Sequence, residues 1–194
     1  MRLIFQKILN SAKLGPVKWP IDWKKEFGTP IQKKVEPEVE DDLRIISLTP
    51  FFSKIFERFV VAWIMEYFGQ YLDPKQFGGM KDNSIAHYMI ELINFVLYNQ
   101  DFNAPIAVLM CAVDFSKAFN RINHNIVITK LADIGAPGWL LNIVMGFLLH
   151  RVMVVRYRGA TSNSMQMPGG SPQGTLLGLI LFLIMINDCG RNDG

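Results

Sequence analysis

The sequence predicts an α+β fold in which a mixed sheet packs on helices, and three observations lead to this prediction. Apolar residues recur at spacings of three and four in several long segments, which is the period of an amphipathic helix. Short apolar or alternating runs lie between those segments, as expected for strands. Half of the 194 residues are hydrophobic and 12% are aromatic, which is enough to build a core and excludes a disordered chain.

The helical period is clearest after Pro50, which can occupy a first helical turn. Apolar residues from Phe52 to Ile64 then follow the three-and-four spacing. The same pattern returns four times along the chain. We expect helices at residues 49–68, 84–98, 124–134, 138–149 and 175–187.

Three segments read as strands. Ile106–Phe115 is an apolar run that ends at a carboxylate, Asp114, and it predicts a strand buried on both faces. Val152–Tyr157 alternates weakly, and Met165–Met167 is expected to pair with it across a polar turn.

The first 35 residues predict a loosely structured basic arm. It contains Pro16, Pro20 and Pro30, and its two tryptophans, Trp19 and Trp23, lie among lysines. A second basic cluster consists of His150, Arg151, Arg156 and Arg158. Such clusters either bind a polyanion or form ordinary solvated surface, and both alternatives stay open.

Composition also excludes several classes of protein. No apolar run approaches the length that crosses a bilayer, and no secretory signal is recognisable at the first residues. We therefore expect a protein without membrane association, located inside the cell in the cytoplasm or nucleus and not secreted. Cys111 and Cys189 lack metal-ligand spacing and are predicted to be buried free thiols.

Three further features suggest chemistry, each beside a structural alternative. Asp114 either caps the following helix or binds a metal at the end of a strand. The glycine-rich loop Gly169–Gly178 either turns tightly into a helix or lets the backbone approach a substrate, with Gln173 as donor and acceptor. Arg44, taken alone, reads as a surface arginine.

Taken together, these stretches resemble the reverse transcriptase domain of non-LTR retrotransposons over roughly residues 28–188. The matching stretches are Arg44–Leu48 with Phe52–Glu57, Gln76–Gly78, Asp114–Asn120 with His124, Pro172–Gly178, and Ile186–Asp188. The resemblance implies the fingers and partial palm of a right-hand polymerase. It divides the chain into the arm (1–35), a fingers-like region (36–105) and a partial palm (106–194).

The resemblance also implies an activity: template-directed transfer of deoxynucleotides to a primer 3′-hydroxyl, with an RNA template, a DNA primer and Mg²⁺ as cofactor. Asp114 matches the first catalytic aspartate and metal ligand, and the main-chain carbonyl of Phe115 matches a secondary ligand. The oligomeric state is left undetermined.

Seven residues match nucleotide-binding positions of the family. The resemblance places Phe119 under the incoming sugar, where it would reject a ribose. It assigns triphosphate contacts to the backbone of Lys117 and Ala118, and contacts with nucleotide and template to Gln173 and Gly174.

Arg44 and Lys33 match the arginine and lysine of the fingers that hold the triphosphate, although Lys34 lies next to Lys33. One departure concerns the second aspartate motif of the family, an aromatic-Ala-Asp-Asp hairpin, which does not follow Asp188 in this sequence. Asp188 and Asp193 are available acids outside any apolar hairpin.

The resemblance therefore implies a domain truncated before its second aspartate motif and inactive in that form. Two alternatives remain: a noncatalytic retroelement-derived relic that binds RNA, and a group II intron-type reverse transcriptase.

Overall fold

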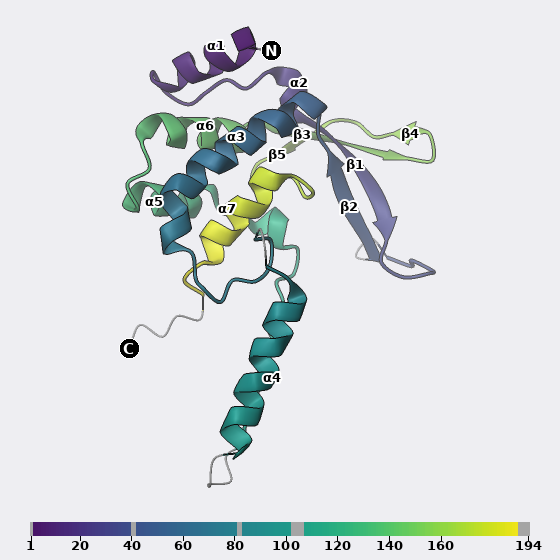
Figure 1. Ribbon diagram of the computed structural model, residues 1–194. Coiled ribbons are helices and arrows are strands. Elements are labelled where there is room, and N and C mark those ends of the chain that lie inside the picture. The colour runs from purple at the N-terminus through teal and green to yellow at the C-terminus, as the bar shows by residue number, and fades with distance from the viewer. Residues whose placement is uncertain (1, 40–41, 81–82, 102–106, 190–194) are drawn as a thin grey trace. The chain divides into compact units, whose positions relative to one another are not determined.

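Figure 1 shows the computed structural model, which describes residues 2–39, 42–80, 83–101 and 107–189. The chain forms two compact units. Unit 1 comprises Met1–Tyr71 and Lys117–Gly194, and unit 2 comprises Leu72–Ser116. The start of the predicted strand at Ile106, the predicted boundary at 105–106 and Asp193 lie outside the described residues.

Unit 1 contains most of the helices and the sheet. Its helices are α1 (Arg2–Ala12), α2 (Ile21–Lys24), α3 (Phe51–Phe68), η2 (Gly69–Tyr71), η3 (Ala118–Arg121), α5 (His124–Asp133), α6 (Gly138–Leu148) and α7 (Leu176–Ile186). Its strands are β1 (Lys25–Gln32), β2 (Leu43–Leu48), β3 (Arg151–Tyr157), β4 (Ala160–Thr161) and β5 (Met165–Met167).

The core of unit 1 lies among α3, α5, α6 and α7. Helix α3 packs on α6 and α7, and α5 packs on the same two helices (Figure 1). Their apolar faces supply side chains with no exposed surface, namely Phe56, Val60, Ile64, Leu131, Leu140, Ile143, Val144, Phe147, Leu181 and Ile184. The sequence prediction of these four helices is confirmed, and each of them buries apolar side chains in this core.

The sheet is mixed, as predicted. Strand β1 pairs antiparallel with β2 and parallel with β3. Strand β3 also pairs antiparallel with β4 and with β5, and the register of Arg151 opposite Met167 confirms the predicted pairing across the polar turn. The order β2-β1-β3-β4, with β5 also on β3, brings residues 25–48 beside residues 151–167.

The loosely structured arm predicted for residues 1–35 is wrong. These residues form α1, α2 and β1, and Ile8, Ala12, Trp19 and Trp23 are buried. The indole N–H of Trp19 donates to the carbonyl of Ile143 at 3.1 Å. Burial of large aromatic rings against α3 and α6 orders the segment despite its prolines and lysines.

A buried ion pair joins the start of β1 to the start of β3. The Nε of Arg151 lies 3.0 Å from Oε1 of Glu26, and both side chains are almost fully buried. Arg151 also donates to the carbonyl of Phe147 at 3.1 Å and covers that ring. Arg151 therefore belongs to the core, and the basic cluster predicted around it loses one of its exposed members.

Unit 2 contains α4 (Ile85–Asp101) and, after it, residues 107–115 in no regular structure. The predicted helix is confirmed, but the buried strand is wrong over residues 107–115. Leu109 and Val113 are 95% and 80% exposed. A strand needs a hydrogen-bonded neighbour and covering side chains. The described part of unit 2 supplies no second strand.

Both cysteines are free thiols, as predicted, but Cys111 and Cys189 are exposed where burial was expected. Cys111 lies in the uncovered segment of unit 2, and Cys189 lies beyond the end of α7. None of the helices in the described residues is long and apolar enough to cross a membrane.

Candidate functional site

The loop between β5 and α7, residues 168–175, is hydrogen-bonded to η3 and to the residue that follows it. The amide of Ser171 donates to the carbonyl of Phe119 at 2.9 Å, and the amide of Gly170 donates to the carbonyl of Ile122 at 3.2 Å. A ring nitrogen of His124 lies 2.7 Å from the carbonyl oxygen of Gly170. These bonds place the loop directly against the segment that carries Phe119.

Glycine is required in the loop because of this close approach. Gly170 has φ +76°, and a Cβ built there would lie 2.8 Å from the carbonyl oxygen of Phe119. In the first turn of α7, a Cβ built on Gly178 would lie 2.6 Å from Oγ of Ser171. Any side chain at these two positions would push the loop away from η3 or from α7.

The same loop also forms a hydrogen bond with β2. The amide of Ser47 donates to the carbonyl of Gln173 at 2.9 Å. Gly174 has φ +101°, and a Cβ built there would lie 3.4 Å from the side chain of Ile46. This bridging loop therefore carries Gln173 and Gly174 between β2 and η3, the segment that holds Ala118 and Phe119.

Helix η3 begins at an unusual backbone conformation. Lys117 precedes it with φ 53° and ψ 45°, and the amide of Asn120 donates to the carbonyl of Lys117 at 2.9 Å. The ring centroid of Phe119 lies 5.8 Å from that of Phe182 on α7, which leaves Phe119 half-buried. The left-handed residue is costly for a non-glycine side chain, and such conformations concentrate at functional sites.

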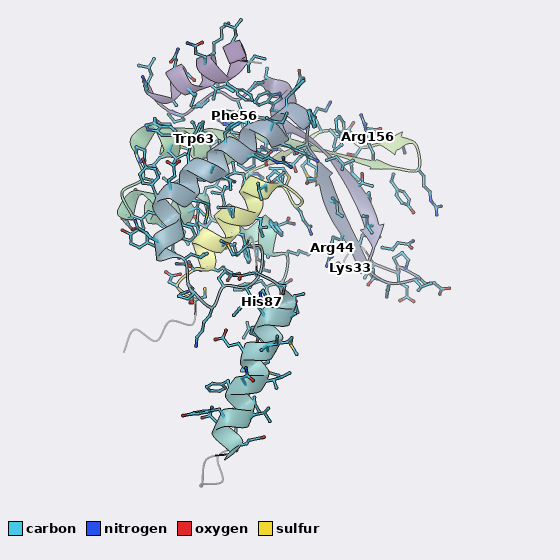
Figure 2. The ribbon with its side chains drawn as sticks, viewed as in Figure 1. Lys33, Arg44, Phe56, Trp63, His87 and Arg156 are labelled. Atoms are coloured by element: carbon cyan, nitrogen blue, oxygen red, sulfur yellow. The ribbon has the colours of Figure 1, made fainter. Side chains whose placement is uncertain are left out.

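Arg44 and Lys33 lie on the β1–β2 hairpin. Arg44 is exposed on β2 opposite Ile31, and Lys33 follows the end of β1, where its amide donates to the carbonyl of Asp42 (Figure 2). Lys34 forms an ion pair of 2.9 Å with the carboxylate of Asp42. The Lys34 ammonium, with the amides of Glu38 and Val39, lowers the pKa of Asp42.

Asp114 and Phe115 lie in unit 2, in the exposed segment described above. Because the Asp114 carboxylate is exposed, it needs no bound cation to offset a burial cost. An exposed carboxylate is a suitable ligand for a hard cation such as magnesium. However, the described residues bring no three His, Cys, Asp or Glu side chains together. They fit one ligand and not a complete magnesium site.

Asp188, the other acid in the described residues that the motifs pointed to, makes a different contact. Its Oδ1 lies 2.5 Å from Nζ of Lys130 on α5, and that lysine also donates to the carbonyl of Met185. This ion pair joins the end of α7 to α5, which is a structural role.

One residue of the site was missed by sequence reasoning. Glu57 on α3 is 1% exposed, and Oε1 accepts from the hydroxyl of Ser53 at 3.1 Å. The amide of Leu177, in the first turn of α7, lies near this carboxylate and favours its charged form. Burial raises the pKa of Glu57 above its ordinary value, and the Ser53 hydroxyl and the Leu177 amide oppose this rise.

Glu57 therefore lies against the start of α7, immediately after the bridging loop. Thr175 caps the same helix, because its hydroxyl accepts from the amide of Gly178 at 3.1 Å. The sequence does show that Glu57 follows Ser53 by four residues on the apolar side of a predicted helix. This spacing predicts a hydrogen bond between the two side chains, but it does not predict that Glu57 lies near Leu177 of α7.

Comparisons with known proteins identify the family of this chain. Residues 31–192 match the family described as reverse transcriptase (RNA-dependent DNA polymerase). The chain is 28% identical to a probable RNA-directed DNA polymerase from transposon X-element of Drosophila melanogaster. The match covers 90% of this chain and 19% of that protein.

Two further similar proteins come from the same organism. The chain is 26% identical, over 96% of its length, to 20% of a probable RNA-directed DNA polymerase from transposon BS. It is 27% identical, over 97% of its length, to 20% of the RNA-directed DNA polymerase from mobile element jockey. The chain thus spans about a fifth of the length of these relatives. It belongs to the reverse transcriptase (RNA-dependent DNA polymerase) family, and its predicted relationship to the non-LTR retrotransposon enzymes is confirmed.

Proposed function

We propose that this chain supplies the nucleotide-binding surface of an RNA-directed DNA polymerase, which adds deoxynucleotides to a DNA primer on an RNA template. The observation that carries the proposal is the bridging loop, whose three backbone hydrogen bonds join the segment of Phe119 to the strand of Arg44. Within this proposal the β1–β2 hairpin belongs to the fingers, and η3, the loop and α7 belong to the palm.

Each residue has a part that its position supports. The exposed guanidinium of Arg44 can hold a phosphate through two parallel hydrogen bonds, while Lys33 can act on it as a point charge. Backbone groups of Lys117 and Ala118 lie at the start of η3, where they can approach a triphosphate. Phe119 offers a ring beneath a sugar.

The sugar-sensing role of Phe119 depends on its packing. Because Phe182 supports the ring from α7, Phe119 cannot easily withdraw, and a ribose 2′-hydroxyl would meet it. Gln173 and Gly174 lie at the point where the loop contacts β2, and they would contact the nucleotide and template there.

Asp114 is proposed as a single carboxylate ligand for magnesium, with the carbonyl of Phe115 as a second ligand. Since the described residues fit one carboxylate ligand, we further propose that the polypeptide of residues 1–194 alone does not extend a primer.

We also propose an intracellular location, in the cytoplasm or nucleus, where Cys111 and Cys189 would remain free thiols.

The test compares nucleotide binding between variants of the 194-residue chain. Binding of dATP and ATP would be measured by titration calorimetry in a magnesium buffer. We expect wild type to prefer dATP, and Phe119→Ala to lose most of that preference. We expect Arg44→Gln to lower the affinity for both nucleotides about tenfold, because a hydrogen bond from a charged group is lost.

The matched control is Arg58→Gln, which removes the same charge from an exposed arginine of α3. It should leave both affinities unchanged. Equal binding of dATP and ATP by wild type, or an unchanged ratio in Phe119→Ala, would refute the sugar-sensing role. Primer extension by the 194-residue chain would show that a complete metal site is present.

A further inference from the structure

One face of the sheet extends the positive charge of Arg44 with two further cations, Lys25 and Arg156, that the nucleotide site does not use. In the register, Phe27 lies opposite Leu48 and Val154, and Ile31 lies opposite Arg44. Directly opposite residues share a face of a sheet, and alternate residues of a strand return to it. We call Lys25, Phe27, Arg44 and Arg156 on this face the cationic sheet face.

Arg156 is held in place on this face by an aromatic ring. Its guanidinium carbon lies 3.6 Å from the ring centroid of Phe27, and Nζ of Lys25 lies 5.4 Å from the same centroid. A planar guanidinium stacks well on an aromatic ring, and stacking fixes its orientation without using its N–H donors. Arg156 is exposed, so these donors face solvent (Figure 2).

The positive charge of the face is not neutralised nearby. Within the described ranges, neither Arg44 nor Arg156 has a carboxylate oxygen within 4.0 Å. Glu26, the acid next to Lys25, belongs to the opposite face and is buried against Arg151. A surface with unpaired guanidinium groups attracts a polyanion.

Apolar side chains on the same face indicate which polyanion. Ile31 and Leu48 are 48% and 51% exposed, and both share the face of Arg44 and Phe27. A duplex hides its bases, whereas a single strand offers unstacked bases to apolar side chains and to guanidinium planes. Phosphates and bases of one strand would therefore both find partners here.

We propose that the cationic sheet face binds single-stranded RNA, with Arg156 donating to a backbone phosphate from its stack on Phe27. The inference rests on the proposed function, because it names a binding surface for the RNA template. Arg156 adds to that function a residue of β3, and of the two alternatives left open for its basic cluster the proposal takes the polyanion site.

The experiment measures binding of the 194-residue chain to a labelled, unstructured single-stranded RNA by fluorescence anisotropy at several salt concentrations. Arg156→Gln should weaken binding about fivefold and lower the salt slope by about 0.7 to 1, the value of one phosphate contact. Arg58→Gln, with the same charge change on α3, should change affinity less than about twofold. Circular dichroism would confirm that both variants are folded.

A second pair of variants tests the stack. Phe27→Leu keeps an apolar side chain and all charges but removes the ring, and we expect weaker RNA binding. Arg156→Lys keeps the charge but loses the planar stack, so it should keep most of the salt slope while binding more weakly than wild type. Wild-type affinity in both variants would overturn the role of the stack.

Competition separates the other partners. Unlabelled single-stranded RNA should displace the probe, while duplex RNA or an acidic peptide should compete weakly. Equal competition by either one would overturn the assignment to single-stranded RNA, as would equal effects of Arg156→Gln and Arg58→Gln. Absence of salt-sensitive RNA binding by wild type would overturn this surface, while the dATP and ATP titrations would still decide the nucleotide site independently.

Discussion

The bridging loop of unit 1 and the segment 107–115 of unit 2 carry two of the motifs that suggested the function, and their structures differ sharply. The loop is bonded to η3 through Ser171 and to β2 through Gln173. The segment has no regular structure, and Asp114 at its end is exposed. The loop is held in one position because its hydrogen-bond partners, η3 and β2, belong to the same compact unit. An apolar run is not made into a strand by its composition alone, because it also needs partners.

The largest expected effect compares the same substitution in the two regions. Leu181→Ala in the core beneath the loop should lower the free energy of unfolding by about 2 to 5 kcal/mol, because it leaves a cavity. Leu109→Ala in the exposed segment should change it by less than about 0.5 kcal/mol. Urea denaturation measures both. A cost for Leu109→Ala near that of Leu181→Ala would mean that the segment is buried after all.

A second comparison uses two glycines with left-handed backbones. Gly170→Ala should destabilise by about 2 to 3 kcal/mol, because its Cβ would meet the carbonyl of Phe119 and its φ is +76°. Gly159→Ala, with φ +83° and open space around its Cβ, should cost only the backbone strain of about 1 kcal/mol. The difference between the two unfolding free energies measures the close contact of the loop with η3. Equal costs would show that the loop does not press on that segment.

The pH dependence of stability tests the contact of Glu57 with α7. Burial raises the pKa of this carboxyl above 4.5, so the folded protein binds more protons than the unfolded chain above that pH. The free energy of unfolding of wild type should therefore fall, relative to Glu57→Gln, as pH rises from about 4.5 to the raised pKa. The slope is at most about 1.4 kcal/mol per pH unit for one proton.

Urea denaturation at a series of pH values checks this prediction. Glu66→Gln, at an exposed position of the same helix, is the matched control and should leave the slope of wild type unchanged. Identical curves for wild type and Glu57→Gln would contradict a buried carboxyl at the start of α7.

The smallest expected effect concerns the cap of α7. Thr175→Ala removes the hydroxyl that accepts from the amide of Gly178 and should destabilise by about 1 kcal/mol. Thr175→Ser keeps the hydroxyl and is the control, with a much smaller change. The same urea titrations measure both variants, and a neutral Thr175→Ala would place the start of the helix elsewhere.

The sequence predicted α3, α5, α6 and α7 of unit 1 because each is a long segment rich in apolar residues. Pro50 and Thr175, which lie within one residue of the starts predicted from sequence, are the N-cap residues of α3 and α7. It also predicted the pairing of β3 with β5 from one turn. These features depend on neighbours along the chain, which a sequence displays directly.

The features that failed depend on neighbours far along the chain. Trp19 and Trp23 are ordered by α3 and α6, and Arg151 is buried by Glu26, 125 residues away. The motif residues Phe119 and Gln173 were predicted individually, but the bonds that join their segments were not. Glu57 shows the same limit, since its partner on α7 lies at a distance that no local period reveals.

The most direct test of the bridging loop as a prebuilt nucleotide site is amide hydrogen exchange of the 194-residue chain, with and without dATP. We predict slow exchange at Ser47 and Ser171 and fast exchange over residues 107–113 in the free protein. Addition of dATP should slow exchange further at residues 44–47, 117–120 and 170–174. Fast exchange at Ser47 and Ser171, or no effect of dATP on these three segments, would contradict the account.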